Sequence, residues 1–102
     1  MIKVSVMYPN KTDGHFNIEY YKTVHMQMIN DTVGHILKGY EVDAAISKEL
    51  CEVDSPYIAI GHLIFESLET FQKEYLPHRD TFKADLVNFT DITPIVQISE
   101  IK

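Results

Sequence analysis

The segment YIAIGHLIFE, residues 57–66, places the strongest constraint on the fold of this chain. Successive side chains of a strand point to opposite faces of the sheet. One face of this segment carries Ala59, Gly61, Leu63 and Phe65, and the other carries Ile58, Ile60, His62 and Ile64. Both sets are apolar apart from the histidine, so both faces of the sheet need a cover. Helices of the same chain can cover one face, and a second subunit could cover the other.

Three further segments alternate apolar and polar side chains in the manner that predicts a strand. They are residues 2–8, 36–46 and 95–101. The order of all predicted elements is strand, helix, strand, strand, helix, strand, which is typical of a ferredoxin-like α+β fold with an antiparallel four-stranded sheet. Because residues 1–102 contain neither a linker nor a repeat, we expect one domain.

Two helices are predicted between these strands. Apolar residues at spacings of three and four follow Ile18, and Asn17 occupies the position of a favoured helix N-cap. We expect Gly34 to end this helix in a left-handed conformation. Ser67 is placed to cap the second helix, and we expect Pro77 to stop it before a shorter helical piece.

Composition excludes several classes of function. The chain has 9 Lys+Arg against 15 Asp+Glu and a formal net charge of −6, which argues against binding to nucleic acid or to an anionic membrane surface. No apolar run approaches the ~18 residues of a spanning helix, and the first residues begin a strand pattern instead of a signal peptide, so a cytoplasmic protein is predicted.

Cysteine and glycine usage limits the cofactors. Cys51 is the only cysteine, so no intrachain disulfide can form, and acidic neighbours favour an ordinary loop cysteine over a nucleophile. The sequence contains no metal-binding motif and no glycine-rich phosphate loop. We therefore predict no metal and no tightly bound cofactor, while a site built in the fold from histidines alone, or haem held by a buried histidine, stays open.

Two histidines are candidates for catalysis. His25 lies on the apolar stripe of the first predicted helix, and His62 lies among the isoleucines of residues 57–66. Burial lowers the pKa of an imidazole and keeps it neutral, as a general base must be. The alternative is a core histidine whose ring is satisfied by a backbone carbonyl. Phenols and imidazoles are the polar groups that orient a ligand in a mostly apolar cavity, and the candidate binding residues are Tyr8, Tyr20, Tyr21, Tyr40, Ile60 and Ile64.

Four stretches of the chain resemble the EthD family. They are MIKVSVMYPN, FNIEYYKTVHM, YIAIGHLIFESLETFQ and NFTDITPIVQISEI, which together span nearly the whole chain. The YYxxxHxP segment of the family corresponds to Tyr20, Tyr21 and His25, with Gln27 in place of the usual proline, so we expect a straighter helix here. The GHL step of the family corresponds to residues 61–63, with Leu63 and Phe65 expected to face the helices and His62 the opposite side.

The resemblance implies a dimeric alpha-beta barrel, in which two ferredoxin-like subunits press their sheets together and enclose small-molecule pockets. Relatives that share this barrel include cofactor-independent monooxygenases, polyketide cyclases, muconolactone isomerases and haem-degrading enzymes. By this resemblance we expect a homodimeric oxidoreductase or a ring-modifying cyclase or isomerase for a small hydrophobic or phenolic compound. His25 would be the general base or acid, and His62 and Tyr20 would orient the ligand.

Two other functions agree with the same residues. The protein could be a non-catalytic accessory protein that binds or hands over such a compound in a degradation pathway. Alternatively, it could be a dimer whose histidines and tyrosines are structural and whose interior contains no cavity.

Overall fold

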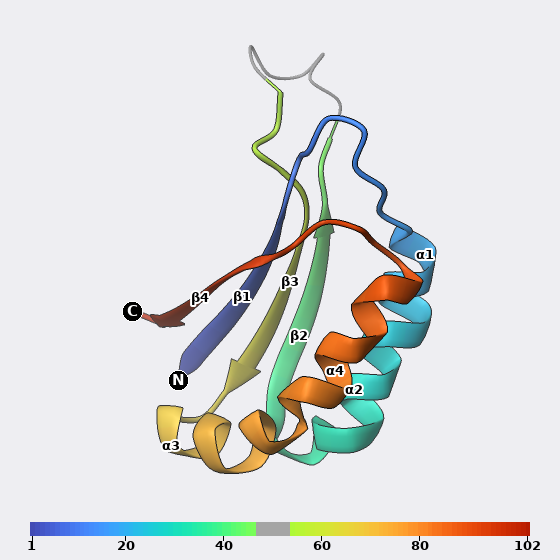
Figure 1. The fold of residues 1–102 in the computed structure, drawn as a ribbon. Coiled ribbons are helices and arrows are strands. Elements are labelled where there is room, and N and C mark those ends of the chain that lie inside the picture. Colours follow the sequence, from blue (N-terminus) through green and yellow to red (C-terminus); the bar gives the residue numbers. More distant parts are fainter. Residues whose placement is uncertain (47–53) are drawn as a thin grey trace.

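A four-stranded antiparallel sheet with helices on one side forms the molecule (Figure 1). The computed structural model describes residues 1–46 and 54–102, so the prediction for Cys51 lies outside the described residues. The strands are β1 (Ile2–Pro9), β2 (Leu37–Ala44), β3 (Tyr57–Phe65) and β4 (Ile95–Glu100). Their order in the sheet is β2-β3-β1-β4, which confirms the predicted ferredoxin-like arrangement.

The two faces of the sheet have different surroundings. On the covered face, which lies under the helices, Val4 pairs with Leu63, and Leu63 and Phe65 are fully buried. On the opposite, open face, Ser5 pairs with His62. The prediction that Leu63 and Phe65 face the helices and His62 points away is therefore confirmed. The side chains of Ile60 and Ile64 alternate onto the open face and stay partly exposed, whereas Ile58, next to an irregularity in the pairing of β1 and β3, packs against the core.

The first helical segment begins as predicted. It consists of α1 (Ile18–Tyr20), a wide turn over Tyr21–His25, α2 (Met26–Val33) and a tight final turn over Gly34–Ile36. The side chain of Asn17 accepts a hydrogen bond from the Tyr20 N–H at 3.1 Å, which confirms this residue as the N-cap. The prediction of a left-handed Gly34 was wrong, because its φ is −57°. A Cβ at Gly34 would lie 2.6 Å from Oδ1 of Asn30, so the glycine makes room for that side chain.

The second helical segment repeats the construction of the first. Ser67 caps α3 (Leu68–Thr70), a wide turn follows over Phe71–Tyr75, and the chain continues through Leu76–His78 into α4 (Arg79–Ala84) and a last turn over Asp85–Asn88. The helix ends at Tyr75, just before Pro77, and a shorter helical piece follows, as predicted. Pro77 lies in the first turn of the tight Leu76–His78 piece between them, where a helix needs no N–H from it.

The wide turns align aromatic side chains that are four residues apart. In such a turn the backbone hydrogen bond spans five residues, as between the Met26 N–H and the Tyr21 carbonyl. Tyr21 and His25 consequently stack with ring centroids 5.5 Å apart and planes inclined by 18°. Phe71 and Tyr75 stack in the same way at 5.2 Å and 20°. Both helical segments therefore present a stacked pair to the covered face.

The helices of the described residues, 1–46 and 54–102, are all too short or too polar to span a lipid bilayer.

Candidate functional site

A cavity of about 260 Å³ lies between the covered face of the sheet and the two helical segments. Much of its wall is apolar and includes Leu63, Phe82 and Leu86. The side chains in the wall that carry a polar atom are Tyr8, Tyr21, His25, Tyr75, Arg79, Lys83 and Thr93. An apolar cavity with a few polar groups is the usual form of a small-molecule site.

His25 is tied to a carboxylate from the other helical segment. Its Nδ1 lies 2.9 Å from Oδ2 of Asp85, and the two side chains are only 5% and 15% exposed. An ionised carboxylate only accepts hydrogen bonds, so Nδ1 carries the proton and donates a hydrogen bond to Asp85. Burial lowers the pKa of His25 below its ordinary value of 6.5, although Asp85 partly opposes this effect. The imidazole is therefore neutral at pH 7, with a lone pair on Nε2.

The second ring nitrogen of His25 is available to a ligand. Within residues 1–46 and 54–102, Nε2 has no hydrogen-bond partner, and no fully buried side-chain nitrogen or oxygen is without one. Nε2 is therefore not sealed in the core, and His25 lines the cavity. We conclude that Nε2 is the basic atom exposed to the cavity.

Two more side chains hold Asp85 in place. The Tyr20 hydroxyl and the Asn88 amide each donate a hydrogen bond to Oδ1 of Asp85 at 2.8 Å. Partial burial opposes ionisation of Asp85, but the hydrogen bonds from Asn88, His25 and Tyr20 outweigh it and lower the pKa of Asp85 below 3.8. The same bond to Asp85 raises the pKa of Tyr20. Tyr20 therefore positions His25 through Asp85.

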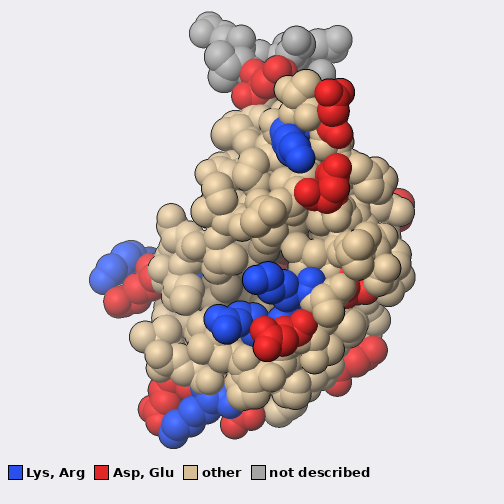
Figure 2. Space-filling model, viewed as in Figure 1, with Lys and Arg blue, Asp and Glu red and all other residues tan. Residues whose placement is uncertain are grey.

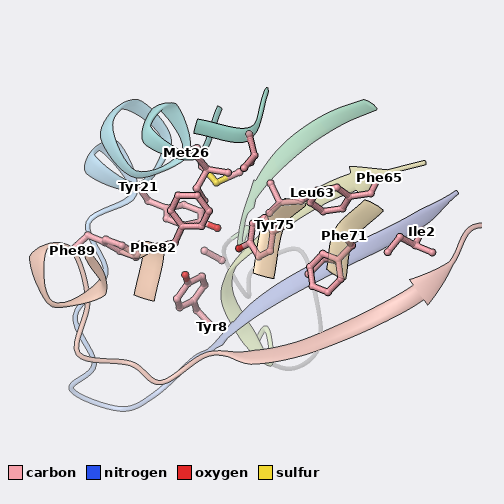
Figure 3. Packing of buried hydrophobic residues seen from close by; sticks show 14 of the residues in the cluster. Ile2, Tyr8, Tyr21, Met26, Leu63, Phe65, Phe71, Tyr75, Phe82 and Phe89 are labelled. Carbon is pink, nitrogen blue, oxygen red and sulfur yellow. The ribbon is translucent and has the colours of Figure 1, made fainter. Parts of the chain in front are cut away.

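Three tyrosine hydroxyl groups turn toward one space in the cavity, and one of them belongs to Tyr21, whose ring stacks on His25. Figure 3 shows the hydroxyl ends of Tyr8, Tyr21 and Tyr75 converging between the sheet and the helices. Burial, together with the nearby Tyr21 phenol, raises the pKa of Tyr8, and burial raises the pKa of Tyr21 as well. Burial raises the pKa of Tyr75 to about 12. All three phenols stay protonated at neutral pH. Tyr8 donates its hydrogen bond to Tyr21, so the hydroxyl groups of Tyr21 and Tyr75 are the ones that can donate to a ligand.

The phenol of Tyr21 packs directly against Gly61 on β3. A Cβ at Gly61 would lie 3.1 Å from Cζ of Tyr21 and would overlap its hydroxyl oxygen. Since any side chain at this position would displace the phenol, the glycine permits the close approach of Tyr21 to the sheet. The GHL step thus contributes its glycine to the cavity.

The structure divides the sequence-predicted site residues between the two faces of the sheet. Tyr8, Tyr21 and His25 line the cavity, and Tyr20 reaches it only through Asp85. Tyr40 is 40% exposed on β2 and does not contribute to the wall. The residues that lie on the open face, away from His25, are Ile60, His62 and Ile64. His62 and His25 therefore do not share one cavity.

His62 has its own polar partners on the open face. Its Nδ1 lies 3.0 Å from the Ser5 hydroxyl, and its Nε2 lies 3.0 Å from Oδ2 of Asp43. These are the residue types of a nucleophilic triad. The backbone around Ser5 and His62 is paired between β1 and β3, so its N–H groups are engaged in the sheet and do not form an oxyanion hole. This group does not line the cavity.

Sequence reasoning missed Asp85 and Tyr75 as site residues. No local pattern connects Asp85 with His25, which precedes it by sixty positions. Tyr75 could have been found, because it stands eight positions after the cap Ser67, as His25 stands eight after the cap Asn17. Within the described part of the chain, no group of three or more His, Cys, Asp or Glu side chains is arranged to hold a metal ion.

No protein-family model matches the sequence, and no curated protein matches it. Among solved structures, an EthD-like protein from Ralstonia eutropha is 32% identical to this chain with a TM-score of 0.87, and the alignment covers 97% of this chain and 89% of the relative. A protein of the ethyl tert-butyl ether D (EthD) family from Bacillus halodurans is 15% identical with a TM-score of 0.75, over 100% of this chain and 99% of its own.

A third solved structure shares the fold. It is described as a dimeric protein of unknown function with a ferredoxin-like fold, comes from Bacteroides fragilis, and is 13% identical with a TM-score of 0.54 over 98% of this chain and 95% of its own. The fold match extends over the full sheet and both helical segments in all three comparisons. The 32% identity over nearly the whole length of the Ralstonia protein, in agreement with the motifs quoted above, shows that the chain belongs to the EthD family.

Proposed function

We propose that the protein is an enzyme that binds a small hydrophobic or phenolic compound in this cavity and transfers a proton through His25. The observation that carries the proposal is one cavity whose wall holds both a neutral imidazole, hydrogen-bonded to Asp85, and three protonated phenols. A cavity of about 150 Å³ accommodates one benzene ring, so about 260 Å³ is suited to a compound of one or two rings.

The proton transfer uses atoms that the structure positions. Nε2 of His25 takes a proton from a phenol O–H or from a C–H beside a carbonyl group, and the resulting imidazolium is stabilised by Asp85 on the other nitrogen. The phenols of Tyr21 and Tyr75 donate hydrogen bonds to the oxygen on which negative charge develops, and Tyr8 supports Tyr21 by a hydrogen bond of its own. The deprotonated compound is then the species that isomerises, cyclises or reacts with dioxygen.

A proton-exchange assay tests the role of His25 with a probe compound in place of the natural substrate. The compound 2-tetralone is a two-ring ketone whose activated CH₂ group exchanges with solvent deuterium, and NMR follows the exchange in D₂O. We expect the native protein to accelerate the exchange and His25→Gln to reduce the catalysed rate by about 100-fold, the usual contribution of a general base. Glutamine can still donate a hydrogen bond to Asp85, so the pocket stays assembled.

His62→Gln is the matched control because His62 is also paired with an aspartate but lies on the open face. It should leave the catalysed rate unchanged. An equal rate in native protein and His25→Gln would contradict the proposal. Saturable binding of the ketone without any catalysed exchange would contradict proton transfer and favour a non-catalytic accessory protein that binds such compounds.

We further propose that a second copy of the chain covers the open face. The support is its apolar content: Ile60, Ile64 and Met7 lie there partly exposed, and Ile95 of β4 is 52% exposed. The Bacteroides protein of the same fold is described as dimeric. Exposed apolar area of this kind is typical of a subunit interface.

Sedimentation velocity tests the dimer. The native protein should have the sedimentation coefficient of a dimer. Ile60→Glu should convert it to a monomer, because the new charge would be buried in the interface. Val87→Glu is the control, since Val87 is 81% exposed on the helical side and should leave the assembly intact. A native protein that is monomeric at high micromolar concentration would contradict this proposal.

A further inference from the structure

Two cationic side chains line the same cavity from one helix. Arg79 and Lys83 are one helical turn apart on α4, and both are exposed to solvent while contributing to the cavity wall, so they lie at its mouth. Figure 2 shows Lys and Arg side chains gathered beside a hollow near the middle of the viewed face. No Asp or Glu is found among the described residues that line the cavity.

These two cations differ from most other basic residues of the described chain in having no acidic partner. The paired ones are Lys22 with Glu19, Lys38 with Glu66, Lys73 with Glu69, and Lys102 with Glu100. The side chains of Arg79 and Lys83 make no hydrogen bond or ion pair with any residue of 1–46 and 54–102, although the protein has a net charge of −6. Like charges four residues apart also destabilise a helix slightly. Their position therefore has a cost that a bound anion would remove.

We infer that the cavity selects an aromatic carboxylate, whose rings occupy the apolar interior and whose carboxylate is held at the mouth by Arg79 and Lys83. This inference rests on the proposed function, because it concerns the same cavity. A guanidinium binds a carboxylate with two parallel hydrogen bonds, and an ammonium adds a second positive charge. The imidazole of His25 is neutral and does not compete for the anion.

The residues that would hold the carboxylate and those that would act on the reacting atom come from different parts of the cavity wall. His25 and the phenols of Tyr8 and Tyr21 lie between the sheet and the first helical segment, whereas Arg79 and Lys83 belong to α4 of the second. The carboxylate would thus be recognised at the mouth and the reacting O–H or C–H would be presented to His25. The two cations determine which compounds bind and take no part in the proton transfer.

A pair of probes that share the same two rings but differ in charge tests the inference. The probes are 2-naphthoate and its methyl ester, and their dissociation constants are measured by quenching of naphthalene fluorescence. We expect the native protein to bind the acid at least about tenfold more tightly than the ester, as charge-assisted hydrogen bonds imply. Arg79→Gln and Lys83→Gln should each weaken binding of the acid and leave binding of the ester unchanged.

Two further variants control for charge and for folding. Lys73→Gln removes the same charge from an exposed position of the second helical segment that does not line the cavity, so it should leave both dissociation constants unchanged. Arg79→Lys keeps the charge but loses the paired hydrogen bonds, so it should retain part of the preference for the acid.

The outcomes separate this inference from the proposed function. Equal affinity of acid and ester in the native protein, unchanged by Arg79→Gln, would overturn the carboxylate inference and leave the cavity and His25 in place. A preference for the acid that Lys73→Gln abolishes as strongly as Arg79→Gln would also overturn it, because the effect would then come from overall charge. Absence of binding by both probes, together with absence of exchange of 2-tetralone, would overturn the proposed function as well.

Discussion

Two histidine–aspartate pairs lie on opposite faces of the same sheet and have almost the same nitrogen–oxygen distance. His25 and Asp85 are 2.9 Å apart on the covered side, and His62 and Asp43 are 3.0 Å apart on the open face. Their surroundings differ, because the side chains of the first pair are 5% and 15% exposed and those of the second are 16% and 57% exposed. The first pair also lies beside a cavity.

The comparison shows that a short His–Asp distance does not by itself define a site. Burial lowers the pKa of His25, and its free nitrogen faces a cavity that can hold a ligand. Asp85 is further held by Tyr20 and Asn88, which orient the carboxylate. On the open face, Asp43 is more than half exposed, so water screens its interaction with His62.

The largest expected difference in stability between the two faces is between alanine variants of their glycines. Gly61→Ala places a methyl group on the phenol of Tyr21, whereas a Cβ at Gly39 on β2 would meet only Ile64 Cδ1 at 3.8 Å, an ordinary contact. We expect Gly61→Ala to lower the free energy of unfolding by about 3 kcal/mol, the upper end for an overpacked core. Urea denaturation of both variants measures this.

Gly39→Ala serves as the control in that experiment and should not destabilise the protein. If Gly61→Ala were as stable as the native protein, Tyr21 would not be seated against β3 as described. The same variant should also weaken binding of 2-naphthoate, because the displaced phenol enters the cavity.

A smaller difference in the free energy of unfolding is expected between alanine variants of the two aspartates. Asp85→Ala leaves Nδ1 of the buried His25 without a partner, so we expect a loss of about 2 kcal/mol in the free energy of unfolding. Asp43→Ala should cost about 0 to 1 kcal/mol, as for exposed ion pairs. Urea denaturation at pH 7 of both variants, compared with the native protein, tests the contrast, and equal losses would contradict it.

The pH dependence of the proton exchange sharpens the assignment of the base. His25 must be neutral to accept a proton, and its pKa is lowered below 6.5 by burial. The rate of 2-tetralone exchange should therefore rise with pH through a pKa below 6.5 and then become constant. A rate that still rises between pH 7 and 9, by about tenfold per unit, would assign the base to another group.

The smallest expected effect is on stability as a function of pH. In the unfolded chain His25 binds a proton near pH 6.5, whereas in the folded protein it does so only at lower pH. Between these values the unfolded state holds more protons, so the free energy of unfolding falls as the pH decreases from about 6.5 and levels off below the folded pKa. Denaturation curves at several pH values should show this fall in native protein and a weaker one in His25→Gln.

The sequence by itself determined the order of the strands and helices, both helix starts and the family. Those features depend on local signals: the alternation in residues 57–66, the caps Asn17 and Ser67, and motifs that are contiguous along the chain. The conformation at the end of the first helix was predicted less well. Gly34 makes room for the side chain of Asn30 instead of adopting a left-handed conformation, which propensity alone does not reveal.

The tertiary structure alone decided which residues form the site. It separated His62 from His25, joined His25 to Asp85 across sixty positions of the chain, and placed Tyr75, Arg79 and Lys83 around one cavity. Periodicity shows which side chains share a face of one element, but the face that a neighbouring element covers depends on how strands and helices pack together. The identity of the site therefore follows from packing, whereas the fold follows from local pattern.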